Sequence, residues 1–301
     1  MESKTGGFPF VPFLKRTEVN IEFEAVRLGR LFRRRFRRPL DEPQRLGFYQ
    51  VFCGTKGEGR YTVDFETHAY EPGDLVFSAP GQIQQFHPSP NVDGILLVFT
   101  NEFFAQEPSD QPLLSSSLLF NPWSPSPVVR PGAKGDFGFL GAFRALEREY
   151  RRGSRDVFRE PLLRSMLKTI LLQAERLKQR SSSPAAIVQL PRFLQFKTLL
   201  ERGFGSMRKV GEYAAEMGVS ARTLNRVTRL ASGLTAKDFI DARVVLELKR
   251  LLAHTDLGLK EITSAMGFDE PTNLVKYFRQ RTRLRPMQFR ATWRKRGAFL
   301  P

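Results

Sequence analysis

The sequence predicts an α+β fold. An N-terminal antiparallel β-barrel with two helices should precede an all-α domain containing two helix-turn-helix motifs. Three observations predict it: β-rich runs with Gly and Pro turns occupy residues 21–104, helical periodicity starts near residue 136, and no strand pattern interrupts the chain after residue 187. The predicted domains are therefore 1–180 and 187–301, joined by a short polar linker at 181–186.

The N-terminal half contains short runs of strand-forming residues, such as FYQVF, RYTVDF and ILLVF. Turn sequences such as Glu71-Pro72-Gly73-Asp74 separate them, which is typical of a small antiparallel barrel or sandwich. Before them, residues 1–20 are expected to form an extended arm. The Arg-rich run RLFRRRFRRP at 30–39 is expected to be a solvated edge strand, with DNA phosphate or an acidic partner as the alternative role.

Two amphipathic helices are predicted within residues 136–180, joined near Gly153. The second has an apolar stripe of Leu163, Met166, Leu167, Ile170 and Leu171. Such a stripe covers either the barrel of its own chain or a second copy of the chain. From it we expect a homodimer, with packing against the barrel as the alternative.

The charge of the chain points to a polyanionic partner. The net charge is +17, and residues 187–301 hold 22 Lys and Arg against 10 Asp and Glu. No uninterrupted apolar run approaches the roughly 18 residues of a membrane-spanning helix, so a membrane partner is not expected. The single cysteine, Cys53, forbids an intrachain disulfide, and the N-terminus lacks the pattern of a signal peptide. A cytoplasmic location is therefore expected.

The C-terminal domain is predicted to be all helix, with helices at about 187–202, 207–217, 220–231, 236–253, 258–266, 270–281 and 286–295. Two pairs of helices share one design. In each, a helix ends at a Met-Gly pair, Met217-Gly218 or Met266-Gly267, and glycine suits the left-handed turn that closes a helix. A second helix follows at once, with Ser220 and Asp269 as the expected N-caps. This is the helix-turn-helix arrangement.

The second helix of each pair has an apolar face and a polar face. Leu224, Val227 and Ala231 in the first, and Leu274 and Phe278 in the second, should face inward. The exposed DNA-binding candidates are Arg222, Asn225, Arg226 and Arg229, followed by Thr272, Asn273, Lys276 and Arg279. Arg and Asn make paired hydrogen bonds to base edges, and a helix of this width fits the major groove. One such face could be an ordinary solvated surface, but two faces after matched turns in a basic domain favour DNA.

The segment between the two motifs is predicted to be one long helix. Thr235 and Asp238 have the spacing of a capping box, and residues 236–253 follow an apolar helical pattern. A helix of that length is a rod of roughly 27 Å. It could hold two recognition helices about 34 Å apart, the length of one DNA turn.

At residues 187–301 the chain resembles the AraC/XylS family of bacterial regulators. The resemblance rests on GVSARTLNR, ARVVLELKRLL and EITSAMGFDEPTNLVKYFRQRTRLRPMQFR, and on a closing pattern met by Phe278, Pro286, Phe289 and Arg290. It implies base reading by Arg222, Asn225, Arg226, Thr272, Asn273 and Lys276. It also implies a transcription activator that contacts RNA polymerase, associates with the nucleoid, and carries a cupin-like barrel and dimerising helices. The chain departs from the family pattern at Thr228, Ala236, Arg283 and Arg285, where the family usually has Phe, Pro, Gly and a small residue.

The string HAYEPGDLVFSAPGQIQQF at 68–86 resembles a cupin-like barrel segment. A cupin metal site needs clustered His with a carboxylate, but this half offers only His68 and His87, with Gln82 and Gln84 near the expected ligand positions. Cys53 has no evident catalytic partner and is expected to be buried. No metal, cofactor or enzymatic activity is therefore expected.

A small-molecule effector is more plausible than catalysis, because barrel mouths are common ligand sites. By residue type and location the candidates are Tyr49, Phe52, Arg60, Tyr61 and Phe77, although ordinary barrel core would give the same pattern. The competing hypotheses are a cupin-type enzyme with a fused DNA-binding region and a non-specific architectural DNA binder.

Overall fold

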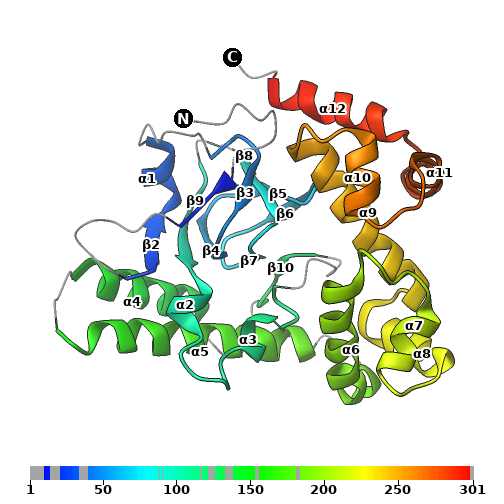
Figure 1. Ribbon diagram of the computed structural model, residues 1–301. Coiled ribbons are helices and arrows are strands. Elements are labelled where there is room, and N and C mark those ends of the chain that lie inside the picture. Colours follow the sequence, from blue (N-terminus) through cyan, green and yellow to red (C-terminus); the bar gives the residue numbers. More distant parts are fainter. Residues whose placement is uncertain are drawn as a thin grey trace. The chain divides into compact units, whose positions relative to one another are not determined.

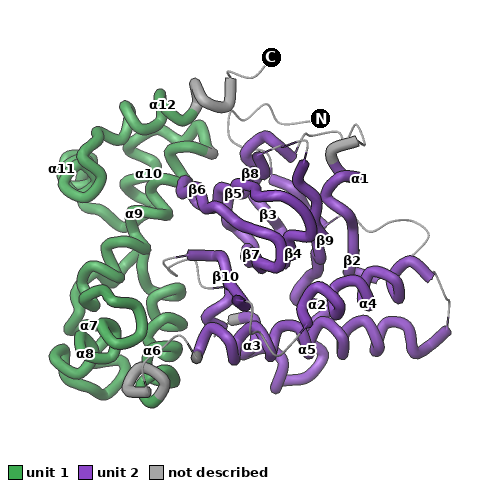
Figure 2. The backbone as a smooth tube through the Cα atoms, turned by 180° about the vertical axis from the view of Figure 1, so that it is seen from behind, with its two compact units in different colours: residues 1–9, 182–301 green, residues 10–181 purple. Residues whose placement is uncertain are grey.

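The computed structural model describes residues 10–13, 21–33, 40–87, 89, 91–115, 117–120, 126–132, 138–152, 156–180 and 184–298. The chain divides into two compact units, one formed by residues 10–181 and the other containing residues 182–301 (Figure 2).

The strands of the first unit form two five-stranded sheets within its described residues. The first has the order β1 (Phe10–Val11), β3 (Gln44–Leu46), β8 (Ile83–His87), β5 (Gly59–Val63) and β6 (Glu66–Tyr70). The second has the order β10 (Val128–Val129), β7 (Leu75–Ser78), β4 (Tyr49–Lys56), β9 (Asp93–Phe99) and β2 (Phe23–Arg27). Neighbouring strands are antiparallel except for β1 and β3, which are parallel. The predicted α+β class is confirmed, whereas the described strands form two sheets and not a closed barrel.

The second sheet is apolar on both faces because it separates two cores. On β4, Phe52 faces the first sheet and packs with Tyr61 and Phe86, whereas its neighbours Val51 and Cys53 face the opposite way. This alternation follows from the two-residue repeat of a strand. One core therefore lies between the sheets, and the other lies between the second sheet and the helices that cover it.

The covering helices are α4 (Phe139–Arg152) and α5 (Arg159–Arg180), which lie side by side over the second sheet (Figure 1). Two shorter helices, α2 (Asn101–Phe104) and α3 (Pro112–Ser115), complete this layer. Of the stripe predicted to dimerise, Leu163, Leu167, Ile170 and Leu171 are at most 1% exposed and belong to this core, and Met166 packs against it. The expected dimer through this stripe is wrong, because the stripe covers the chain's own sheet.

The Arg-rich run is not an edge strand where the structure describes it. Helix α1 spans Leu28–Arg33, and Leu28 and Leu31 pack into the core between the sheets. Their spacing of three residues puts both on one side of a helix, which is why helix replaces strand. Residues 34–39 lie outside the described part of the chain.

The second unit is helical throughout its described residues. Its helices are α6 (Pro184–Gly203), α7 (Val210–Glu216), α8 (Ala221–Ser232), α9 (Ala236–His254), α10 (Leu259–Ala265), α11 (Pro271–Thr282) and α12 (Pro286–Ala298) (Figure 1). All seven predicted helices are present, with ends shifted by up to three residues. The start of α6 at Pro184, instead of 187, reflects the preference of proline for the first turn of a helix.

Two aromatic clusters form the core of this unit. Around the first helix pair, Phe196 contacts Tyr213 and Phe239 at ring-centroid distances of 5.5 and 5.7 Å. Around the second, Phe278 meets Phe289 at 5.7 Å. Because Phe239 lies on α9, this helix contributes to the first cluster. None of the described helices of the chain is long and apolar enough to cross a membrane.

Candidate nucleic-acid interface

Both helix pairs turn at the predicted glycines. Gly218 has φ +62° and Gly267 has φ +59°, the left-handed region that favours glycine. The residue after each glycine donates its backbone N–H to a carbonyl five residues earlier, from Val219 to Ala214 and from Phe268 to Thr263. This is the Schellman closure of a helix, and it confirms the prediction drawn from the Met-Gly pairs.

The second helices of the two pairs, α8 and α11, are called the recognition helices below, and they start in different ways. At α8 the predicted N-cap is confirmed, since the Ser220 hydroxyl accepts the backbone N–H of Thr223 at 3.1 Å. At α11 the prediction of Asp269 is wrong, and Glu270 occupies the N-cap position. The reason is Pro271, whose fixed φ and missing N–H suit the first helical position and set the helix start one residue later.

The outer face of α8 carries positive charge. Arg222, Arg226 and Arg229 are exposed, whereas Leu224 and Val227 are at most 1% exposed. The helix contains no acidic residue. Three cationic side chains therefore face outward without a neutralising carboxylate on their own helix.

Asn225 lies on the same helix but its side chain is already engaged. Its Oδ1 accepts the backbone N–H of Ala236, the first residue of α9, at 3.0 Å. Its Nδ2 donates to the carbonyl of Ala221 at 3.2 Å. The Oδ1 bond holds α8 against the start of α9, while the Nδ2 bond stays within α8. Both ends of the Asn225 amide are therefore engaged, which argues against the predicted role of this residue in base reading.

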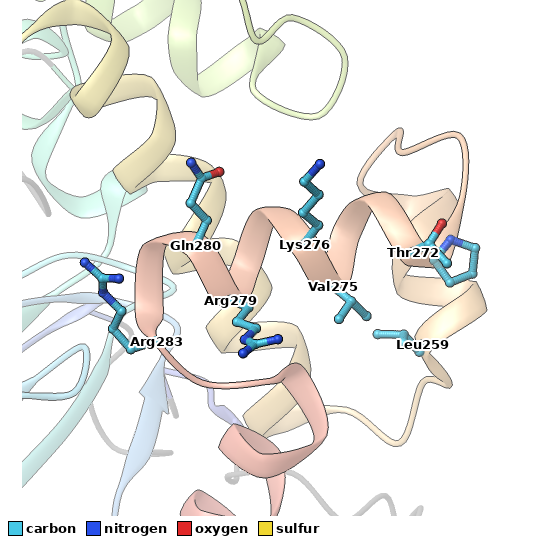
Figure 3. Close-up of a pocket in the computed structure, with 8 residues that line it drawn as sticks. Leu259, Thr272, Val275, Lys276, Arg279, Gln280 and Arg283 are labelled. Carbon is cyan, nitrogen blue, oxygen red and sulfur yellow. The ribbon is translucent and has the colours of Figure 1, made fainter.

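The outer face of α11 matches the predicted pattern. Thr272, Asn273, Lys276 and Arg279 are exposed, while Leu274 and Phe278 are fully buried. A hollow runs along this helix (Figure 3). It is lined by Leu259, Pro271, Thr272, Val275, Lys276, Arg279, Gln280 and Arg283. Three of the four predicted residues therefore share one concave surface, and Asn273 lies outside it.

Arg283 ends α11 in the left-handed conformation, with φ 65° and ψ 0°. Gly233 occupies the corresponding position after α8, with φ 76°. Among the described residues the guanidinium of Arg283 has no hydrogen bond or ion pair, and Arg285 is also exposed. A left-handed non-glycine residue costs roughly 1–2 kcal/mol, so the structure retains strain at a cation beside the hollow.

Two further predictions concern the first motif. Thr235 caps α9, since its hydroxyl accepts the backbone N–H of Asp238 at 3.0 Å, as its spacing predicted. Thr228, which stands where the family usually has Phe, is fully buried. Its hydroxyl donates to the carbonyl of Leu224 at 2.8 Å, so the polar group is satisfied inside the core.

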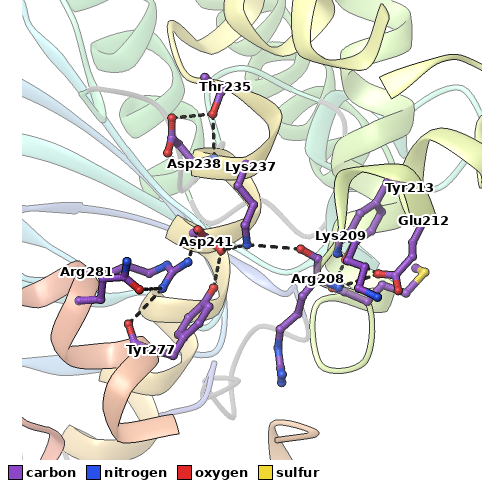
Figure 4. Close-up of polar contacts among 12 residues, drawn as sticks. Arg208, Lys209, Glu212, Tyr213, Thr235, Lys237, Asp238, Asp241, Tyr277 and Arg281 are labelled. Atoms are coloured by element: carbon purple, nitrogen blue, oxygen red, sulfur yellow. Dashed lines mark hydrogen bonds and ion pairs between the residues drawn. The ribbon is translucent and has the colours of Figure 1, made fainter. Parts of the chain in front are cut away.

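The sequence did not identify a polar cluster centred on Asp241 of α9. The carboxylate accepts hydrogen bonds from Tyr277 and Arg281 of α11 and from Lys237 of α9 (Figure 4). Burial, followed by the hydrogen bond to Asp241, raises the pKa of Tyr277, so its hydroxyl remains a donor. An aspartate on the buried side of a helix is itself a sequence signal, because buried charges need partners.

The structure does not bring the five effector candidates together. Phe52 and Tyr61 belong to the core between the sheets, whereas Phe77 belongs to the core beneath the helices and Tyr49 packs against it. Arg60 is exposed. The hydroxyl of Tyr61 is instead bonded to three polar side chains, those of Gln50, Ser78 and Gln84, at 2.7–3.0 Å.

Three of the four residues weighed as cupin ligands, Gln82, Gln84 and His87, have other hydrogen-bond partners. Gln82 donates to Asp64 at 2.8 Å, and His87 is hydrogen-bonded to Thr62 at 2.7 Å. Within the described residues no group of three or more His, Cys, Asp or Glu could hold a metal ion. Cys53 is buried as expected, and burial raises the pKa of its thiol to about 12.

Comparison with protein families gives two matches. A helix-turn-helix domain matches residues 213–292, and an AraC-like ligand binding domain matches residues 30–167. The first range starts within α7 and includes the other helices of both pairs, and the second includes most of the two sheets. No curated protein matches the chain.

Several solved structures are similar to this chain. ToxT from Vibrio cholerae O395 is 8% identical over 90% of this chain and 98% of its own, with a TM-score of 0.43. The DNA-binding domain of AdpA, a global transcriptional factor solved with a target DNA, is 25% identical over 35% of this chain and 96% of its own, with a TM-score of 0.32. The C-terminal domain of the response regulator yesN from Fusobacterium nucleatum subsp. nucleatum is 20% identical over 32% of this chain and 94% of its own, with a TM-score of 0.30.

Proposed function

This chain belongs to the AraC/XylS family of DNA-binding transcription regulators, and we propose that it activates transcription by reading a specific operator with α8 and α11. One observation carries the proposal. Each recognition helix follows a left-handed glycine turn and presents exposed donors without an acidic residue on the helix. The proposed base readers and phosphate contacts are Arg222, Arg226, Arg229, Thr272, Asn273, Lys276 and Arg279.

The test begins with selection of a preferred site from a random DNA pool by the full chain. Arg226→Ala and Asn273→Ala should then each weaken binding to that site by about 1–3 kcal/mol and weaken random DNA much less. Arg202→Ala is the control, because Arg202 is an exposed arginine at the end of α6, outside the recognition helices. Equal losses on selected and random DNA for Arg226→Ala and Asn273→Ala would remove both residues from base reading.

Activation and contact with RNA polymerase are proposed on the family resemblance. The measurement is transcription from a promoter carrying the selected site, with and without the protein. A rise supports activation, and a fall shows a repressor. A non-specific architectural binder would select no site at all, whereas a specific regulator should prefer its site by roughly 10³-fold or more.

We also propose that a small molecule controls the protein by binding its first unit. The match to a ligand-binding domain supports this, and so does the hydroxyl of Tyr70, which is buried between the sheets and has no hydrogen-bond partner among the residues that the structure describes. An effector should raise the melting temperature of the full chain. Tyr70→Phe should reduce that rise if the hydroxyl bonds the ligand.

A homodimer remains a proposal, but on a different surface. The exposed apolar residues just before and along α5 are Val157, Phe158, Leu162 and Leu172. They are not part of the buried stripe, so a second copy could cover them.

A further inference from the structure

The carboxylate of Asp241 joins the long helix α9 to the second recognition helix. Asp241 is 9% exposed. Its Oδ1 accepts a hydrogen bond from the Tyr277 hydroxyl and one from Lys237 Nζ, both at 2.6 Å, and its Oδ2 accepts one from Arg281 Nη2 at 2.6 Å. The Arg281 guanidinium also stacks on the Tyr277 ring at 3.6 Å. We call these four residues the Asp241 clamp (Figure 4).

A second contact joins the two helix-turn-helix motifs directly. The guanidinium of Arg208, just before α7, lies 3.6 Å from the centre of the Phe268 ring and donates to the carbonyl of Met266. The turn at Gly267 lies so close to the carbonyl oxygen of Gly205 that a Cβ atom would be 2.3 Å from it. The segment just before α7 therefore touches the turn of the second motif without help from α9.

Both recognition helices are also attached by hydrogen bonds to one short stretch of α9. Asn225 of α8 bonds to the backbone of Ala236, and Tyr277 and Arg281 of α11 bond to Asp241. These two attachment points are five residues apart, which is roughly 7.5 Å along a helix. The orientation of α11 relative to α8 thus depends on the first two turns of α9, together with the contact of Arg208 with the turn at Gly267.

From this geometry we infer that Asp241 is a positioning residue for operator recognition, because it fixes the direction of α11 relative to α8. The inference rests on the proposed function. Lys237 is exposed and Arg281 is partly buried, and both form ion pairs with the Asp241 carboxylate. Loss of that carboxylate leaves the partly buried charge of Arg281 uncompensated. An operator for this chain must therefore present its two recognition segments at one spacing and one rotational phase.

The first test uses operators in which base pairs are inserted or removed between the two recognition segments. One base pair shifts the second segment by about 3.4 Å and rotates it by about 35°. The wild type should prefer one spacing over its neighbours by about tenfold or more. Asp241→Asn should weaken binding at that spacing and reduce the preference to about threefold or less. An unchanged spacing preference in Asp241→Asn would overturn the inference.

The matched control is Glu247→Gln. Glu247 is another carboxylate of α9, and it pairs with Arg243 and Arg250 of the same helix, not with α11. Glu247→Gln should keep the spacing preference. A milder variant, Tyr277→Phe, removes one hydrogen bond to Asp241 and keeps every charge, so its spacing preference should lie between those of the wild type and Asp241→Asn. If Asp241→Asn does not fold, the reduced spacing preference expected for Tyr277→Phe still tests the clamp.

A second test needs no DNA. Spin labels on Leu230→Cys of α8 and Gln280→Cys of α11 report the distance between the recognition helices in the full chain. Both positions are exposed, and the only native cysteine is buried, so the labels should be confined to the two introduced thiols. The distance distribution should be narrow in the wild type and broader in Asp241→Asn, and equal widths would contradict the clamp. If the wild type binds no specific site, the proposed function fails while this measurement still decides the geometry.

Discussion

The left-handed Arg283 allows one substitution to separate stability from DNA binding. Arg283→Gly should stabilise the DNA-binding unit, because glycine adopts φ 65° without the steric cost of a Cβ atom. That cost is about 1–2 kcal/mol, and the larger entropy of glycine in the unfolded chain offsets about 0.5–1 kcal/mol of it. Since the guanidinium has no hydrogen bond or ion pair within the described structure, little else is lost. The expected net gain is about 0.5–1 kcal/mol.

The same substitution should weaken DNA binding. If Arg283 contacts a phosphate beside the hollow along α11, its loss should weaken selected and random DNA about equally. The slope of log affinity against log salt should then become shallower by about 0.9, the value for one phosphate contact. Arg285→Ala should reduce the slope in the same way without the gain in stability, because Arg285 is not among the residues with positive φ.

Stability is measured by urea unfolding in a Trp123→Phe background, so that fluorescence comes from Trp293 of α12 alone. With a slope of about 2 kcal/mol per molar urea, the midpoint of Arg283→Gly should rise by about 0.3–0.5 M. The control is the opposite change at the matching end of α8, Gly233→Arg, which should lower the midpoint by a similar amount. A lower midpoint for Arg283→Gly would refute the strain argument, and an unchanged salt slope would refute the phosphate contact.

Three other predictions follow from the packing. Asn225→Ala should lower the free energy of unfolding by about 1 kcal/mol in the wild type. In an Ala236→Pro background it should lower that free energy by almost nothing, because proline has no N–H for Asn225 to accept. Equal losses in both backgrounds of this double-mutant cycle would exclude the bond. Leu167→Asp should unfold the first unit, whereas Phe158→Asp should leave it folded and turn any dimer into a monomer by light scattering. The backbone N–H donors of Lys209 and Arg208 lower the pKa of Glu212. The stabilisation by the ionised Glu212 is complete above the ordinary pKa of 4.5 and is lost as the pH falls through the lower pKa of the folded state. Between neutral and acidic pH, the urea midpoint of Glu212→Gln should therefore fall less than the midpoint of the wild type.

The helical part of the fold was predictable because its signals are local. A glycine in the left-handed region, a serine cap and an apolar repeat each act within a few residues, and together they located α7, α8, α10 and α11. The one N-cap error, at Asp269, came from weighing a capping side chain above the proline two residues later. In general, local chemistry fixes where a helix starts and ends.

Sequence could not tell what a predicted apolar face contacts. The stripe of α5 was recognised, but periodicity is the same whether a helix covers its own sheet or a second chain. The effector candidates were not brought together by the fold for a related reason. Phe52 and Phe77 have the residue type expected of a ligand pocket, yet they lie in different cores, on opposite faces of one sheet. The Asp241 clamp was missed because its partners on α11 lie 36 and 40 residues away along the chain.

Asn225 shows how two departures from expectation have one physical cause. The family pattern usually has proline at the first position of the long helix, and proline has no N–H to satisfy. This chain has Ala236 there, so one more backbone donor needs an acceptor at a helix start. The Asn225 side chain supplies that acceptor at 3.0 Å, and the amide that could have read an adenine thereby fastens α8 to α9. The unexpected alanine and the engaged asparagine are therefore the two halves of one hydrogen bond.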